Sequence, residues 1–155
     1  STDRKAEFAR TMGADEIIYY RTESVVTRTR ELTDGRGVDL ILDHVGGPDF
    51  TTYLGALAPW GMIVSYNAFS GLPNKDLLGE MRAHMGVCPA VRVFSFHLYD
   101  NDRDSRRAIM RNLIAQLANG SIKPSISARL KLSEVRKAHA LLESGSALGK
   151  IIMSP

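Results

Sequence analysis

The chain has 155 residues, of which 44% are hydrophobic and 24% are charged, a composition typical of a folded globular protein. Its formal net charge is only +3, and the basic residues are interspersed with acidic ones, so we expect no nucleic-acid partner. The single cysteine excludes an internal disulfide and a thiolate-rich zinc site within the chain. No apolar run approaches the roughly 20 residues of a membrane span, and we expect a reducing, cytoplasmic setting.

The first twenty residues, "STDRKAEFARTMGADEIIYY", predict a capped helix followed by a short strand over 15–20. Ser1, Thr2 and Asp3 have side chains that cap helix starts, and Gly13 suits the position just past a helix end. In α/β proteins such a cap normally follows a strand. Either residue 1 is therefore a true terminus, or a strand precedes it in a longer protein.

The next segments continue the alternation of strands and helices. "SVVTRTRELT" predicts a helix that "DGRG" ends, and "VDLILD" is the continuous apolar run of a buried parallel strand. Pro48 suits a first helical position, ahead of Phe50, Tyr53, Leu54 and Leu57 at helical spacing. "MIVSY" predicts the following strand.

The second half begins with a short amphipathic segment in 72–85. "GVCPAVRVFSF" then predicts a strand in which Pro89 requires an edge position or a bulge. A helix ending at "NG", a strand in "SISARLKL", a helix capped by Ser133 and a final strand in "GKIIM" complete the chain. The pattern predicts an α/β fold.

Residues with chemical potential are few. The four histidines lack metal-ligand spacing, and no G-x-S-x-G motif surrounds a serine. His139 lies on the apolar stripe of its predicted helix, which indicates a half-buried side chain. Cys88 is interpreted as a small buried hydrophobic residue.

Two strand ends carry the strongest functional signal. "DHVGG" and "SYNAFSG" each follow a predicted parallel strand, so we expect both at the carboxyl edge of the sheet, where ligands of open α/β sheets bind. The glycines allow a ligand to approach the backbone closely. Alternatively, they serve only tight turns.

Together, "RKAEFARTMGADEIIYY", "ELTDGRGVDLILDHVGG", "LGALAPWGMIVSYNAFSG" and the tail from "LIAQLANGSIKP" to "GKIIMSP" resemble the medium-chain dehydrogenase/reductase superfamily, in its quinone oxidoreductase-like, zinc-independent branch. The resemblance implies an incomplete doubly wound, Rossmann-type parallel sheet that lacks its first two strands and the G-x-G-x-x-G loop. Residues 1–100 would form a partial NADPH-binding domain. Residues 101–155 would form its terminal helix and the C-terminal part of the catalytic domain.

The implied function is NADPH-dependent hydride transfer to a quinone or an activated carbon–carbon double bond in a small-molecule substrate. The alternatives are an enoyl-thioester reductase, a zinc alcohol dehydrogenase with its metal ligands upstream, and, in another class, a non-enzymatic nucleotide-binding or dimerisation module. No catalytic acid and no metal ligand are identified, and the chain alone is expected to be inactive.

The resemblance also implies cofactor-binding residues. Lys5, with Arg4 beside it, would lie near the 2′-phosphate of NADPH, and Tyr20 near the adenosine. The resemblance places Val45 and Gly46 near the adenine and ribose, and Tyr66, Asn67 and Ala68 near the nicotinamide. A later loop on the nicotinamide side would contribute Phe94, Ser95 and Phe96. Lys150, near the end of the chain, is a weaker candidate for cofactor binding. The family often has glycine where Asn67 stands.

Members of this family commonly dimerise through the strand that 86–94 resembles. A homodimer would then pair this edge and bury Val91 and Val93. The alternative is an edge covered by the tail of the chain itself.

Overall fold

The computed structural model describes residues 2–155, which form two compact units. The first contains residues 15–98 together with Thr2, and the second contains residues 3–14 and 99–155. The division of the chain into domains at residues 100 and 101 stays a prediction.

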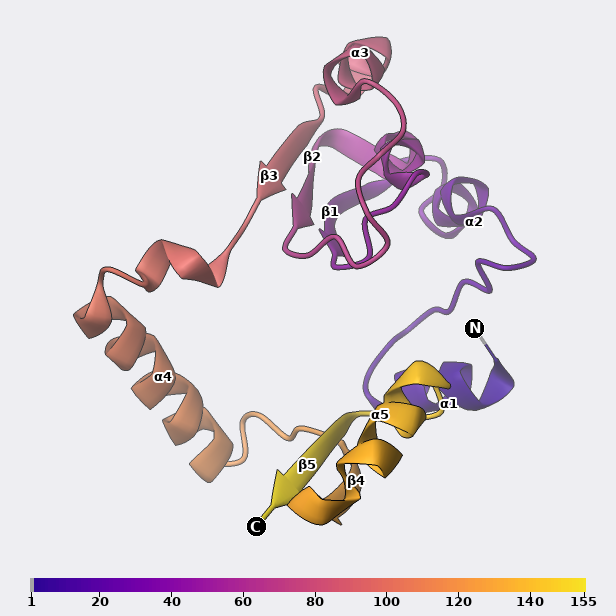
Figure 1. The fold of residues 1–155 in the computed structure, drawn as a ribbon. Helices are drawn as coiled ribbons and strands as arrows, with labels where there is room; N and C mark the ends of the chain where they lie inside the picture. Colours follow the sequence, from indigo (N-terminus) through magenta and orange to yellow (C-terminus); the bar gives the residue numbers. More distant parts are fainter. Residues whose placement is uncertain (1) are drawn as a thin grey trace. The chain divides into compact units, whose positions relative to one another are not determined.

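A parallel three-stranded sheet is the centre of the first unit (Figure 1). Its strands are β1 (Val38–Asp43), β2 (Leu57–Ser65) and β3 (Ala90–Val93), in the order β1-β2-β3. Each strand is parallel to its neighbour, and the connections between them contain helical segments. This sequential parallel arrangement is one half of a doubly wound sheet, which confirms the predicted fold class.

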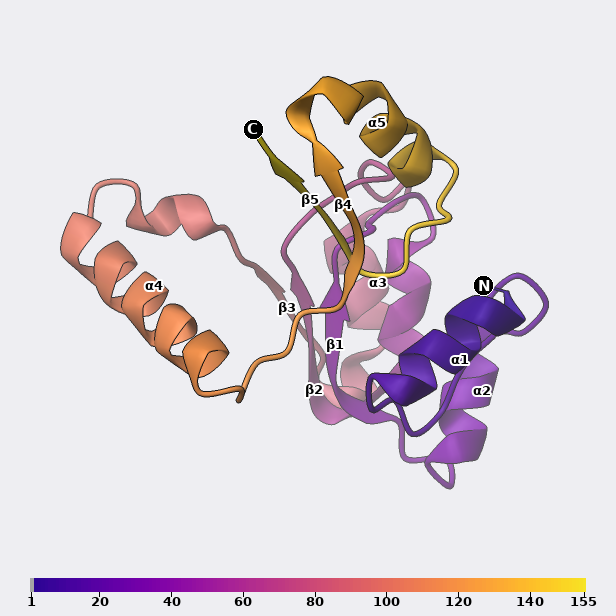
Figure 2. The ribbon, with the colours of Figure 1, turned by 90° about the horizontal axis from the view of Figure 1, so that it is seen from below.

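One face of this sheet carries the hydrophobic core. Ile41, Ile63 and Val91 are neighbours across the three strands, and they point to the same face because side chains alternate along a strand. The 3-10 helix η1 (Phe50–Ala56) packs Phe50 and Leu54 against this row. Helix α3 (Leu77–Ala83) adds Leu77 and Met81, and α2 (Val25–Leu32) contacts η1 (Figure 2). Removing these apolar side chains from water is the main stabilising term for the sheet.

The second unit contains a separate parallel pair of strands, β4 (Ile126–Lys131) and β5 (Lys150–Ser154). Helix α5 (Val135–Glu143) connects them, with Ala138 and Leu130 buried. This unit also contains α1 (Asp3–Thr11) and the 16-residue α4 (Arg103–Ala118). Short 3-10 turns complete the chain: η2 (Met85–Val87), η3 (Phe96–Tyr99) and η4 (Leu132–Glu134).

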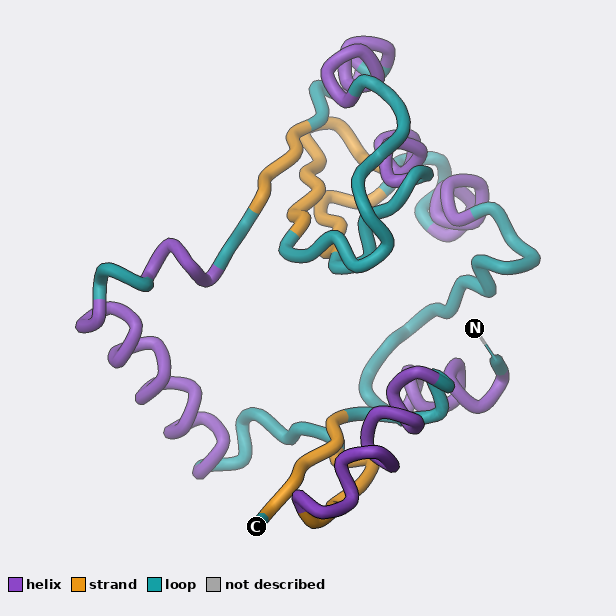
Figure 3. Tube along the Cα trace, in the orientation of Figure 1, coloured by secondary structure: helices purple, strands orange, loops and turns teal. Residues whose placement is uncertain are grey.

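The strand predicted over residues 15–20 is absent, and Figure 3 shows the connection from α1 to α2 as loop. A strand needs a neighbour to satisfy its backbone N–H and C=O groups. In a doubly wound sheet of order 3-2-1-4-5-6, the third strand pairs only with the second. No strand among residues 2–155 pairs with this segment, so the prediction from its apolar residues was wrong.

Other element boundaries also differ from the predictions, and β2 begins at Leu57, which the spacing had placed on a helix face. The helix expected to begin at Pro48 is the 3-10 helix η1, with Asp49 at its N-cap. The strand expected over 86–96 contains only Ala90–Val93, because η2 and a left-handed Cys88 precede it. Pro89 lies immediately before this edge strand, as its missing N–H requires. Ser133 lies inside η4, where Glu134 provides the cap instead.

The structure also corrects two burial predictions. Cys88 is exposed, since its position between η2 and the edge strand leaves the side chain outside the core. His139 is exposed as well, because α5 buries only Ala138 in this part of the helix. Within residues 2–155, no helix combines the length and apolar character needed to cross a membrane.

Trp60 lies in the left-handed region, with φ of +65°, and its side chain is 81% exposed. This conformation costs an L-residue about 1–2 kcal/mol, whereas glycine adopts it freely. Trp60→Gly is therefore expected to raise the free energy of unfolding by about 1 kcal/mol, measured by thermal or denaturant unfolding. Trp60→Ala keeps the Cβ and should give no comparable gain. An equal gain from both variants would mean that the exposed indole, not the backbone, is the cause.

Candidate functional site

The loops that follow β1 and β2 meet at the carboxyl edge of the first unit's sheet. Ser70 N donates to Val45 O at 2.7 Å, and Gly47 N donates to Gly71 O at 2.8 Å. The predicted meeting of "DHVGG" and "SYNAFSG" at one edge is confirmed. We call these two joined loops, residues 44–47 and 66–71, the ledge.

A buried carboxylate lies beneath the ledge. Asp43, the last residue of β1, is 6% exposed, and its side chain accepts hydrogen bonds from Val45 N at 3.2 Å and from Gly46 N at 3.2 and 3.1 Å. Ser65 Oγ donates to Asp43 Oδ2 at 3.4 Å, and Tyr66 N donates to Asp43 O at 2.9 Å. One residue therefore contacts both loops and the end of β2.

The two glycines in the first loop of the ledge are required by its packing. Gly46 and Gly47 have φ of +63° and +94°, in the region that favours glycine. A Cβ at Gly46 would lie 2.7 Å from Gly71 O and 3.1 Å from Ala68 Cα. The turn interpretation of these glycines is thus correct, while close approach of a ligand stays a prediction.

Tyr20 and Val45, predicted separately for the adenosine side, line the same cavity of about 580 Å³. His44 and Tyr53 line it as well, and it lies wholly within the first unit. Burial raises the pKa of the Tyr53 hydroxyl, and the negative charges of Asp43 and Asp49 raise it further. The cavity therefore offers planar aromatic surface next to the neutral hydroxyl group of Tyr53.

The residues predicted for the nicotinamide side lie along the same edge. The rings of His44 and Tyr66 stack with centroids 6.0 Å apart and planes at 25°. Phe94 N donates to Ser65 O at 2.9 Å, which ties the segment after β3 to the end of β2. Asn67 Oδ1 accepts from Ala68 N at 2.9 Å. Ser95 and Phe96 follow Phe94 and are exposed.

Three predicted cofactor residues belong to the second unit. Arg4 and Lys5 are exposed on α1, and Lys150 is the exposed first residue of β5. Lys5 Nζ lies 3.3 Å from the position that a Cβ of Gly145 would take, just after the end of α5. A cation is favourable near a helix C-terminus, and Lys5 lies where it would stabilise the end of α5 within its own unit.

Comparison with known proteins identifies the family. A family model described as zinc-binding dehydrogenase matches residues 12–153. The chain belongs to this family. It is 31% identical over 155 residues to a quinone oxidoreductase of Pseudomonas aeruginosa, and 32% identical over 154 residues to one of Salmonella typhimurium. These alignments cover 100% and 98% of the chain but only 47% and 46% of the relatives, so the chain spans about half of their length.

A solved structure supports the assignment. The quinone oxidoreductase of Escherichia coli complexed with NADPH matches 99% of this chain and 47% of its own, with 29% identity and a TM-score of 0.86. The predicted resemblance to the quinone oxidoreductase branch of medium-chain dehydrogenases is confirmed.

The family name raises the question of a metal. Among the described residues, no group of three or more His, Cys, Asp and Glu side chains is placed to hold a metal ion. The residues present therefore do not fit a zinc ion, and we assign none of them to one.

The sequence did not indicate three residues that lie at the ledge or on the cavity beside it: Asp43, His44 and Tyr53. A signal existed for Asp43, because an acidic residue at the end of a buried strand must find hydrogen-bond donors. His44 is part of the loop "DHVGG", but nothing in the sequence indicated a role for its side chain. Tyr53 was counted as part of a helix face, and nothing in its spacing indicated that it lines a cavity.

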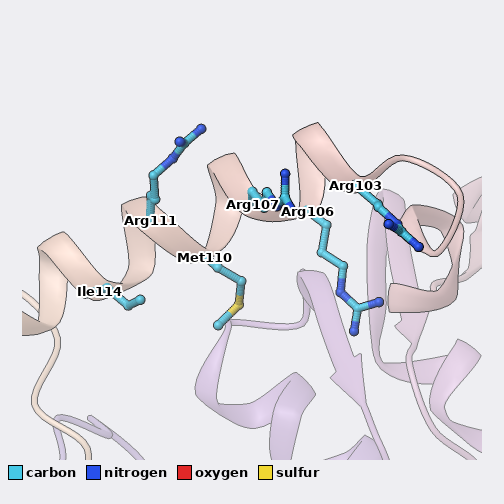
Figure 4. Close-up of a pocket in the computed structure, with 6 residues that line it drawn as sticks. All are labelled: Arg103, Arg106, Arg107, Met110, Arg111 and Ile114. Carbon is cyan, nitrogen blue, oxygen red and sulfur yellow. The ribbon is translucent and has the colours of Figure 1, made fainter.

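A second cavity, of about 440 Å³, lies on α4 and is lined by four arginines with Met110 and Ile114 (Figure 4). The side chains of Arg106 and Arg111 point to opposite sides of the helix, so the guanidinium groups do not converge on one point. Arg106 also pairs with Asp100 at 3.0 Å. This surface contains none of the predicted cofactor residues.

Gly46→Ala is expected to lower the free energy of unfolding by about 2 kcal/mol, because the new Cβ meets Gly71 O and the backbone stays left-handed. Denaturant unfolding measures the change. Gly86→Ala is the matched control, since a Cβ there meets nothing within 4 Å and φ is not positive. Equal stability of the two variants would contradict the tight packing of the ledge.

Proposed function

We propose that the complete protein is an NADPH-dependent oxidoreductase that transfers hydride to a quinone or an activated carbon–carbon double bond. The observation that carries the proposal is the ledge at the carboxyl edge of the sheet, with Tyr20 and Val45 on one cavity beside it. Support comes from two relatives named quinone oxidoreductase and from the structure of a third in complex with NADPH. A relative named 2-haloacrylate reductase, from Burkholderia sp, is 28% identical and supports the activated double bond.

The residues present fit the adenosine half of the dinucleotide. The cavity beside Val45 offers aromatic side chains that match a planar base, and the ledge brings backbone without a Cβ to its rim at Gly46. Further along the edge, Tyr66, Asn67 and Ala68 would contact the nicotinamide half. Phe94 and Phe96, 43% and 38% exposed, would cover it from the segment after β3.

When bound, NADPH would supply a hydride from C4 of its nicotinamide and become NADP⁺, and a proton from solvent would complete the reduction of the acceptor. The chain's own residues hold and orient the dinucleotide along the sheet edge, which lowers the entropy cost of the reaction. The aromatic side chains at 66, 94 and 96 would exclude water from the reacting atoms. We assign no proton donor among the described residues.

We further propose that the protein acts in the cytoplasm on a small-molecule substrate. The single, exposed Cys88 suits a reducing compartment, because no disulfide is needed for either unit.

The proposed function predicts that the full-length protein oxidises NADPH with a benzoquinone acceptor and prefers NADPH to NADH. Lys5→Glu should then raise the KM for NADPH by at least about tenfold and reduce or reverse the preference, because it places a negative charge near the 2′-phosphate. Absorbance at the reduced-nicotinamide band measures both rates.

Arg10→Glu is the matched control, since it reverses a charge on the same helix, at an arginine that pairs with Glu7. It should leave the preference for NADPH unchanged. No oxidation of either cofactor by the wild type would overturn the proposed function. A preference that Lys5→Glu does not change would remove only Lys5 from the site and leave its role beside Gly145.

We also propose that the protein forms a homodimer through the segment 86–94. β3 is an edge strand of its sheet, and no other strand among residues 2–155 pairs with its outer side. An unpaired strand edge favours pairing with a second copy. Val93 is 83% exposed and available to such a contact, whereas Val91 packs against the hydrophobic core.

Val93→Lys is therefore the substitution that tests the dimer, because Val91→Lys would also disturb the core. It is expected to shift the full-length protein from dimer to monomer in sedimentation velocity, with circular dichroism unchanged. Leu78→Lys, at a 65% exposed position on α3, is the control and should remain dimeric. A dimer that survives Val93→Lys would place the interface elsewhere.

A further inference from the structure

Asp43 is the residue on which both loops of the ledge depend. Its carboxylate oxygens accept from the backbone of 45 and 46 in the first loop, and its own carbonyl accepts from Tyr66 N in the second. The carboxylate is buried, so removing it leaves the partly buried N–H groups of Val45 and Gly46 without their acceptor. The positions of both loops are thereby linked to one side chain.

This arrangement also decides which polar groups the ledge can offer. The N–H groups of Val45 and Gly46 donate to Asp43, and that of Gly47 donates to Gly71 O. Three consecutive donors are therefore occupied within the fold. Among the described residues, no hydrogen bond reaches the carbonyl oxygens of His44 and Gly46.

At residues 45–47, the ledge suits a hydrogen-bond donor rather than an anion. A phosphate needs N–H groups to bind it, and those of 45–47 are already used. Ribose hydroxyls and the amino group of a base are donors and match free carbonyl oxygens. The chemistry thus favours the nucleoside part of a dinucleotide at this loop.

From this geometry we infer that Asp43 is a positioning residue for the cofactor: it fixes the ledge so that its free carbonyl oxygens meet the nucleoside hydroxyl and amino groups. The inference rests on the proposed function. Asp43 touches no reacting atom and acts through the backbone of 44–47 and 66–71.

Asp43→Ala in the full-length protein tests the inference. We expect the Kd for NADPH, measured by calorimetry, to rise about tenfold or more, while kcat at saturating NADPH falls much less. Hydrogen exchange by mass spectrometry should accelerate in both 44–47 and 66–71. Asp43→Asn keeps one carbonyl oxygen as acceptor and should give intermediate values for affinity and exchange.

Asp49→Ala is the matched control, because this acid precedes η1 without a side-chain capping bond. It should bind NADPH like the wild type. If Asp43→Ala does not fold, the Asp43→Asn variant tests the inference instead. The inference requires that its hydrogen-exchange rate in 44–47 and its Kd for NADPH both rise. A folded Asp43 variant with faster exchange there and wild-type affinity overturns the inference.

Two further outcomes are informative. An Asp43→Asn variant as deficient as Asp43→Ala would mean that the charge, not the hydrogen bonding, matters, and would also overturn the inference. In the wild type, NADPH should protect 44–47 from exchange and inorganic pyrophosphate should not; protection by pyrophosphate contradicts the donor preference. If the wild type binds no NADPH, the proposed function itself fails.

Discussion

The parallel pairing of β1 with β2, which is in register from Leu40 to Asp43 after an irregularity near Val38, is the constraint on which the first unit depends. It aligns Asp43 with Ser65, and the pairing of β2 with β3 aligns Ser65 with Val93. Because all three strands run in the same direction, the segments that follow them emerge at one edge. A shift of one residue would turn Ile41 and Ile63 away from the core, so burial of these side chains fixes the register.

The same register brings a buried polar group to the edge of an apolar core. Asp43 shares the core-facing side of β1 with Ile41, and it is tolerated there because four hydrogen-bond contacts with its carboxylate compensate its burial. The core thus ends where the ledge begins. The hydrogen bonds of one residue thus hold both loops in place, although most of their side chains are exposed.

The other face of this sheet is different in character. Leu40 and Leu42 alternate with the buried residues of β1 and are 52% and 63% exposed. Parallel sheets in α/β proteins are normally covered on both faces. The chain also spans only about half of its quinone oxidoreductase relatives. The apolar run "VDLILD" predicted a strand that is buried on both faces. In the structure, one face of β1 packs against the core, and the apolar side chains on its other face are exposed.

Much of the fold followed from local pattern in the sequence. Continuous apolar runs identified β1 and β2, Pro89 indicated the edge position of β3, and "NG" marked the end of α4. These succeed because strand burial, proline's missing donor and glycine's freedom are properties of a few neighbouring residues. The family resemblance likewise depended on short motifs in a fixed order, and comparison confirmed it.

The remaining features were decided by the tertiary structure, because they depend on contacts with residues that are distant in sequence. Residues 15–20 have the composition of a strand, but a strand forms only where another strand satisfies its backbone. The exposure of Cys88 and the place of Tyr53 on a cavity depend on how η2 and η1 pack, which spacing does not encode. The sequence by itself determined which loops lie at the carboxyl edge. Only the folded chain showed that one carboxylate joins them, since the hydrogen bond between Ser65 and Asp43 links the ends of two strands that are 22 residues apart in sequence.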